Sequence, residues 1–206
     1  MSDIVLGPNG IQMFPRGMAH LSRTFYETAH EFTVGVSRGE LVEPIKYPSA
    51  VVVLLAACLE AYRSEFLALY REAEPARFEK QSAELERERD PTERWYRTPL
   101  LFGAATFDRG REPFQSYRHL VALRNALVHY SPRFRAPDEY PSNTIRELKA
   151  FYAFSNEGNA DWTTQVLNLE CARWGCRTAK AMVLGLHAIV GGNDMSAWPY
   201  PWPDPP

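Results

Sequence analysis

The fold is decided by residues 48–60, which read PSAVVVLLAACLE. Proline is favoured in the first turn of an α-helix, because the backbone N–H that it lacks would have no intrahelical partner there. The run from Ala50 to Cys58 has no polar face, which indicates a helix that is covered on several sides within a bundle. We therefore expect a central helix from Pro48 to about Glu74, with Glu60 as its first charge.

Helical periodicity continues on both sides of this segment. Apolar residues recur at steps of three and four, one face of a helix, in the two segments 18–33 and 114–130, and a long helix is expected over 163–190, where Gly191 and Gly192 stop it. Shorter helices are expected over 77–89, 92–102 and 143–154, and a loop with a short strand over 34–47. No alternation of strands with helices is present. The pattern predicts an all-α fold, a bundle of four to five main helices.

The domain organisation follows from the same pattern and from the prolines near the two ends. Residues 1–197 are expected to form a single helical domain with its core in 48–190, after an irregular lead-in over 1–16. Residues 198–206 form a tail rich in Pro and Trp, whose prolines favour an extended form. This tail either docks on a partner or is a loose chain end, and the sequence leaves both open.

Composition excludes several functional classes. The 206 residues carry a net charge of −2, which argues against a general nucleic-acid coating protein, so contact with nucleic acid must use a local patch. The three cysteines form no Cys-x-x-Cys pair, so we expect neither a metal site nor another cofactor. The N-terminus does not read as a secretory signal, and the longest apolar run is shorter than the roughly 20 residues of a membrane span. We expect a cytoplasmic protein without a membrane partner.

One segment carries polar groups suited to chemistry. Residues 123–130 read LRNALVHY, which sets a guanidinium, a carboxamide and an imidazole into an otherwise apolar helix. At about 100° per residue, Asn125 and His129 share a face, and Arg124 lies on the flank of that face. We therefore expect the three polar heads to converge.

This pattern resembles the signature of the HEPN family, in which Arg and a polar residue, often Asn, are followed after three residues by His near the end of a bundle helix. The upstream segment AACLEAYRSEF, residues 56–66, is similar to the earlier core helix of that family. The resemblance covers roughly residues 48–132. It implies a HEPN-like bundle and a metal-independent endoribonuclease, commonly a toxin of a toxin–antitoxin pair or a phage-defence factor, whose active site forms where two bundles pair.

The residue types fit RNA cleavage. His129 is suited to act as acid or base, because an imidazole titrates near neutral pH. Arg124 is suited to hold the phosphate and the charge of the transition state, and Asn125 to orient the imidazole or to bind a phosphate oxygen. One copy supplies a single histidine, whereas cleavage uses both an acid and a base. We therefore expect a homodimer, with RNA as substrate and an antitoxin protein as a further possible partner.

Further residues are expected to support this site. Glu60 needs a partner on its apolar helix, for which Arg124 and Asn125 are candidates, and an ion pair that only fixes packing is the alternative. Tyr130 follows the motif directly. Contacts with the RNA backbone are expected from the basic side chains nearby in the sequence, Arg118, Arg133 and Arg135.

Two other interpretations stay open. Arg124, Asn125 and His129 would also suit a buried polar network that fixes one helix against another. A non-catalytic HEPN-like module that binds a nucleotide or a protein is the alternative function, and the near-neutral net charge is compatible with it.

Overall fold

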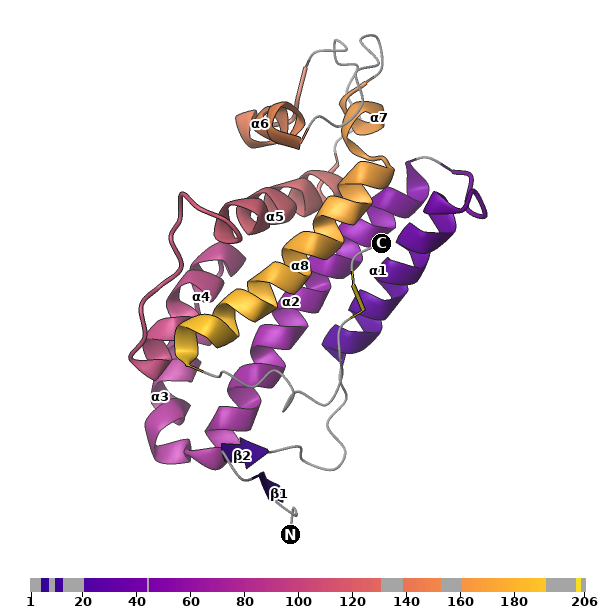
Figure 1. Cartoon of the computed structure of the whole chain (residues 1–206). Coiled ribbons are helices and arrows are strands. Elements are labelled where there is room, and N and C mark those ends of the chain that lie inside the picture. The colour runs from indigo at the N-terminus through magenta and orange to yellow at the C-terminus, as the bar shows by residue number, and fades with distance from the viewer. Residues whose placement is uncertain are drawn as a thin grey trace.

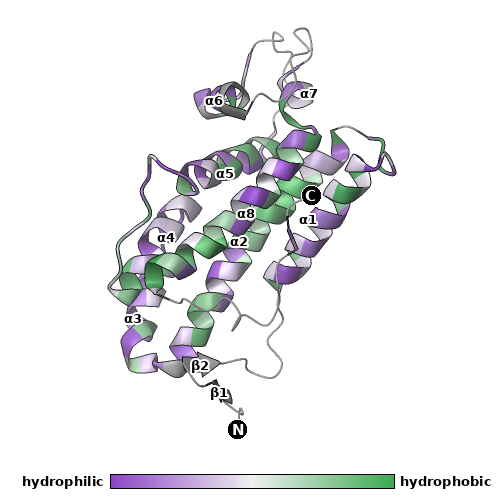
Figure 2. Ribbon diagram, in the orientation of Figure 1, coloured by the Kyte–Doolittle hydropathy of each residue, from purple (hydrophilic) through white to green (hydrophobic). Residues whose placement is uncertain are grey.

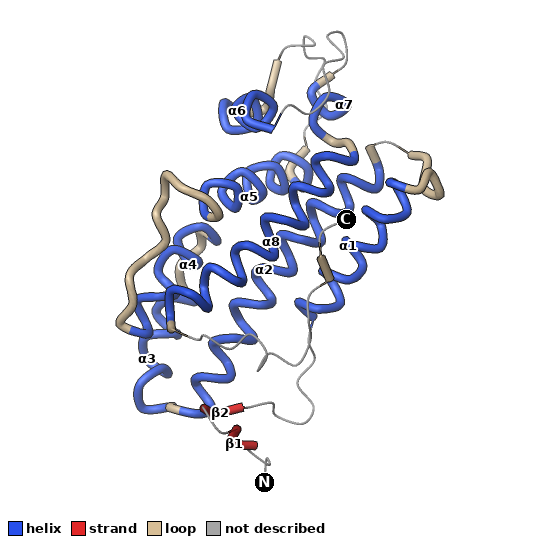
Figure 3. Tube along the Cα trace, viewed as in Figure 1, coloured by secondary structure: helices blue, strands red, loops and turns tan. Residues whose placement is uncertain are grey.

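The computed structural model describes residues 5–7, 10–12, 21–43, 45–130, 139–152, 161–191 and 203–204. Within these residues the protein is an all-α bundle, as the sequence predicts, with one small hairpin of two strands (Figures 1 and 3). The elements are β1 (Val5–Gly7), β2 (Gly10–Gln12), α1 (Leu21–Ser37), α2 (Lys46–Ala73), α3 (Pro75–Glu86), α4 (Pro91–Arg97), the 3₁₀ helix η1 (Thr98–Phe102), α5 (Phe114–Val128), α6 (Asn143–Tyr152), α7 (Trp162–Val166) and α8 (Leu169–Val190).

The long helix α2 forms the centre of the bundle. It packs against α1, α3, α5 and α8, and its contact with α1 is the most extensive of any helix pair described (Figure 1). The side chains of Val51, Val52, Leu55 and Leu59 are fully buried. Hydrophobic residues concentrate where α2 and α8 face the interior, and hydrophilic ones lie outside (Figure 2). The all-round apolar character of residues 50–58 thus matches burial on several sides.

Helix α1 belongs to the same core. Its side chains Tyr26 and Ala29 are buried and join the main hydrophobic cluster, which extends the core beyond the expected range of 48–190. The helix also continues to Ser37, where a loop was expected from residue 34. Gly35 allows this continuation, because Leu41 folds back so closely that a Cβ on Gly35 would lie 2.8 Å from Leu41 Cδ1. The expected short strand over 34–47 does not occur in the described residues there.

The expected C-terminal helix is divided into α7 and α8. The backbone leaves the helical region at Leu167, and the Asn168 side chain accepts a hydrogen bond from Cys171 N at 3.1 Å, which caps the start of α8. Asp161 caps α7 in the same way, through bonds from Thr163 N and Thr164 N. The Asn168 cap therefore interrupts a sequence that is helical by periodicity alone, and Asp161 caps the first of the two resulting helices. The lead-in also differs, since its described part forms the hairpin β1–β2.

Part of the C-terminal tail contacts the bundle. Tyr26 of α1 donates a hydrogen bond to Pro203 O at 3.2 Å, and His30 Nε2 lies 2.9 Å from Asp204 O. Lys180 of α8 pairs with the Asp204 carboxylate at 2.6 Å. These two tail residues thus lie against α1 and α8. The aromatic tail residues Trp198, Tyr200 and Trp202 lie outside the described residues.

Across the described ranges, none of the helices is both long enough and apolar enough to cross a lipid bilayer.

Two neighbouring valines of α2 offer a test of this packing. Val52 is fully buried and Val53 is 36% exposed. We expect Val52→Ala to lower the free energy of unfolding by about 2 kcal/mol, since it removes two buried methyl groups and leaves a cavity. Val53→Ala should change it by less than about 0.5 kcal/mol, because alanine has the higher helix propensity. Urea denaturation measures the free energy of unfolding of both variants. Equal losses would contradict the difference in burial between Val52 and Val53.

Candidate functional site

The candidate site lies at the C-terminal end of α5. The first nine residues of this helix include Phe114, Tyr117, Leu120 and Val121, all buried in the core. Toward its end the side chains become exposed, and His129 forms the cap residue, whose backbone N–H donates to Asn125 O at 2.9 Å. This bond closes the last turn and places Asn125 and His129 one turn apart on a shared face.

The three motif side chains are accessible. Asn125 and His129 are exposed and Arg124 is half-buried. Among the residues that the structure describes, none of the three side chains takes part in a hydrogen bond or an ion pair. This arrangement differs from a buried polar network, because such a network would be satisfied within the fold. The fold thus leaves these polar groups at the surface, available to bind something else.

Two of the expected supporting residues lie beside the motif. Arg118 is exposed and precedes Asn125 by seven residues, which brings it to the same face two turns earlier. Tyr130 directly follows the helix, with its side chain 55% exposed, and Val128 is 54% exposed. Arg133 and Arg135 lie outside the described residues. The end of α5 therefore presents basic, amide, imidazole and aromatic groups on one surface.

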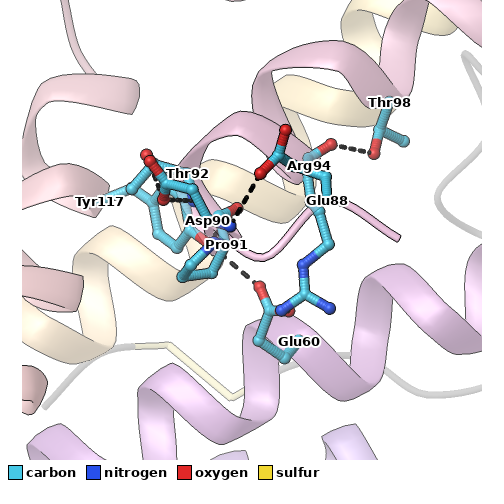
Figure 4. A network of polar contacts seen from close by, with 8 residues as sticks. All are labelled: Glu60, Glu88, Asp90, Pro91, Thr92, Arg94, Thr98 and Tyr117. Carbon is cyan, nitrogen blue, oxygen red and sulfur yellow. Dashed lines mark hydrogen bonds and ion pairs between the residues drawn. The ribbon is translucent and has the colours of Figure 1, made fainter. Parts of the chain in front are cut away.

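Glu60 belongs to a different group of residues. Its carboxylate pairs with Arg94 of α4 at 2.6 Å and accepts a hydrogen bond from Tyr117 Oη at 3.2 Å (Figure 4). Tyr117 Oη also lies 3.1 Å from Pro91 O. Of the two alternatives that the sequence left open, the described structure shows the second, an ion pair of Glu60 with a residue other than Arg124 or Asn125. The physical reason is that α4 packs against α5 and places Arg94 beside the Glu60 carboxylate.

Local bonds hold α4 in position for this contact. Asp90 caps the helix, with Thr92 N and Thr92 Oγ1 at 2.8 and 2.7 Å from its carboxylate, and Glu88 accepts from Asp90 N (Figure 4). Thr98 Oγ1 donates to Arg94 O at 2.7 Å. Tyr117 and Arg124 are seven residues apart on α5, or about 10 Å along the axis. Tyr117, through which α5 contacts Glu60, therefore lies at a different position along α5 from the motif.

His119 does not join the surface at the end of α5. Its side chain is buried, and its Nε2 lies 3.9 Å from the Glu147 carboxylate of α6. Burial lowers the pKa of its imidazole, although the nearby Glu147 acts in the opposite direction. This histidine therefore links α5 to α6 and leaves His129 as the accessible imidazole of this helix.

The structure also shows two arginines inside or at the edge of the bundle that were not expected from the sequence, Arg63 and Arg94. Arg63 is 1% exposed, and the Arg94 side chain is 24% exposed. A signal for Arg63 was present, because it follows Glu60 by three residues in a helix that is otherwise apolar on that face. Arg94 carried no such signal, since it lies in a short, charged segment.

Comparisons of the chain with protein families, with curated proteins and with solved structures find no match. Within the described part of the chain, no group of three His, Cys, Asp or Glu side chains is placed to hold a metal ion.

The accessibility of the motif makes a prediction about stability. We expect Arg124→Ala, Asn125→Ala and His129→Ala each to change the free energy of unfolding by less than about 0.5 kcal/mol, since these side chains have no described partner to lose. Glu60→Ala should lower it by about 1–3 kcal/mol, because it leaves the Arg94 guanidinium without its carboxylate. Urea denaturation of the four variants tests this, and a large loss for His129→Ala would assign the motif a structural role.

Proposed function

We propose that the protein is a metal-independent endoribonuclease whose active site is formed by Arg124, Asn125 and His129. The observation that carries the proposal is that the fold exposes these side chains at the end of α5 and gives them no described partner. Accessible polar groups of three complementary kinds, held near one helical turn, suit a phosphodiester substrate. The resemblance of residues 123–130 to the HEPN signature supports the same activity.

The proposed reaction uses each group in turn. One His129 takes the proton of the RNA 2′-hydroxyl, whose oxygen attacks the adjacent phosphorus. Arg124 holds the charge on the phosphate oxygens as the transition state forms, and Asn125 orients the imidazole or binds a phosphate oxygen. A second His129 donates a proton to the 5′-oxygen as its bond to phosphorus breaks. The products are a 2′,3′-cyclic phosphate and a free 5′-hydroxyl.

This mechanism needs two copies of the chain. A symmetric homodimer that joins the ends of two α5 helices would bring two His129 and two Arg124 side chains together. The exposed apolar groups of Val128 and Tyr130 lie beside the motif and would be covered in such a dimer. Arg118, on the same face of α5, would then contact the RNA backbone. We propose a cellular role as a toxin controlled by an antitoxin or as a phage-defence factor.

A non-catalytic module that binds a nucleotide or a protein through the same surface is the second candidate. The observation that favours it is the net charge of −2, which supplies no general attraction for RNA. This module would use the same surface at the end of α5 but would not cleave RNA. Binding of a nucleotide by a protein that does not cleave RNA would therefore favour this candidate.

Cleavage of RNA in the presence of EDTA tests the enzyme directly. We expect the wild-type protein to cleave, and His129→Ala to lose at least about a hundredfold in rate, because it removes the acid–base group. Arg124→Ala should lose activity to a similar degree. His30→Ala and Arg97→Ala, which change the same residue types on α1 and α4, serve as matched controls and should retain activity. Absence of cleavage by wild type, or full activity of His129→Ala, would refute the proposal.

Mixing of wild-type and His129→Ala chains tests whether the site is shared. We expect an excess of His129→Ala chain to lower the rate of the wild-type protein, since each mixed dimer holds a single His129 and so lacks either the acid or the base. The same excess of His30→Ala chain, which keeps His129, should not lower the rate. The cleavage assay measures the rate after the subunits have exchanged, and a rate that excess His129→Ala chain leaves unchanged would contradict a composite site.

A further inference from the structure

A second polar group lies inside the bundle, away from the end of α5. It consists of Glu60 and Arg63 of α2, Arg94 of α4 and Tyr117 of α5, and we call it the inner arginine cluster (Figure 4 shows its Glu60, Arg94 and Tyr117). Arg63 interacts electrostatically with the other three members. The cluster thus joins three helices at one place.

Arg63 is the unusual member of the inner arginine cluster. It is 1% exposed, and its Nε and Nη1 atoms are buried without a hydrogen-bond partner in the described structure. Both oxygens of the Glu60 carboxylate are already engaged, because Glu60 pairs with Arg94 at 2.6 Å and accepts a hydrogen bond from Tyr117 at 3.2 Å. Burial lowers the pKa of the Arg63 guanidinium, which shows the cost of holding this charge away from water.

The unsatisfied atoms around the cluster are all donors. Besides the two nitrogens of Arg63, they are Arg94 Nε and the Nε1 of Trp95, whose ring lies 5.6 Å from that of Tyr117. Buried donors without acceptors are costly and are rare in folded proteins. Glu60 and Glu86, the two carboxylates that act on Arg63, are each paired with another guanidinium, so three guanidinium groups face two carboxylates and an excess positive charge is left. An acceptor that carries negative charge would satisfy both conditions.

We propose that the inner arginine cluster binds a phosphate group, with Arg63 and Arg94 as its main donors. Guanidinium groups match phosphate oxygens in geometry and charge, and such charge-assisted bonds are among the strongest hydrogen bonds in proteins. A phosphate has more acceptor oxygens than a carboxylate, which fits donors contributed by two helices. Access is from the side of the Glu60–Arg94 pair, whose side chains are 22% and 24% exposed.

The ligand is either inorganic phosphate or the phosphomonoester of a nucleotide. This site does not depend on the proposed ribonuclease activity, because its residues are distinct from Arg124, Asn125 and His129. Binding would connect α2 to α4 and so stabilise the contact between them. The free energy of unfolding would then depend on the concentration of a phosphate compound.

Calorimetric titration of the full chain with inorganic phosphate, at fixed ionic strength, tests the proposal. We expect saturable binding at one site per chain. Arg63→Met should weaken it by about tenfold to a hundredfold, the factor for loss of charge-assisted bonds. Arg173→Met is the matched control, since Arg173 on α8 also has a buried Nε without a partner, and it should bind as wild type does. Titration with AMP distinguishes a monoester ligand from the free ion.

Thermal unfolding provides a second measurement on the same variants. Phosphate stabilises proteins in general by exclusion from their surface, so a rise in Tm is expected for every variant. Wild type and Arg173→Met should show an additional saturable rise that Arg63→Met lacks. Arg63→Met is expected to fold, because replacing a buried charge by an apolar side chain of similar shape is often neutral or stabilising. Absence of saturable binding by wild type, or unchanged binding by Arg63→Met, would overturn the proposal.

Discussion

The burial of α2 along most of its length is the constraint on which the rest of the structure depends. A helix that is apolar all round gains stability only if neighbours cover it on several sides. Helices α1, α5 and α8 do so, and Leu55 and Leu59 become fully buried as a result. Helices α3, α4 and η1 pack against one another and against α2, α5 or α8. The positions of α1, α8 and the buried half of α5 therefore follow from the need to cover α2.

The charged side chains on the second half of α2 fix the positions of the neighbouring helices. Hydrophobic contact alone is not directional, whereas a buried charge requires a partner at a defined position. Glu65 is buried and accepts hydrogen bonds from Ser22 N and Ser22 Oγ, which fixes the start of α1 against α2. Glu60 fixes α4 through Arg94 in the same way. Two carboxylates one to two turns apart thus set the positions of helices on different sides of α2.

The sequence was sufficient to predict a helix where a single physical signal dominated. The unbroken apolar run at residues 50–58 predicted α2, and the three- and four-residue spacing predicted α5. It was insufficient where one particular side-chain contact competed with the periodicity of the sequence. The break before α8 depends on capping by Asn168, which competes with a periodicity that favours one continuous helix. The continuation of α1 depends on Leu41 folding back over Gly35.

The same distinction applies to the candidate site. Spacing placed Asn125 and His129 on one face, since a helix fixes neighbours at short range. Spacing did not identify the partner of Glu60, because that choice depended on how α4 packs against α5 and where it places Arg94. A local propensity rule contains no such information. Arg94 was hidden from sequence analysis for the same reason.

Helix α5 combines two environments, and this division bears on function. Its first part is held by buried residues such as Tyr117 and Leu120, so that the helix cannot shift without disturbing the core. At its C-terminal end, Arg124, Asn125 and His129 have no described side-chain partner that a ligand would have to displace. A rigid helix that ends in accessible polar groups holds them in a fixed geometry without a competing internal contact. The surface at the end of α5 is thus better prepared for binding than a flexible loop with the same residues would be.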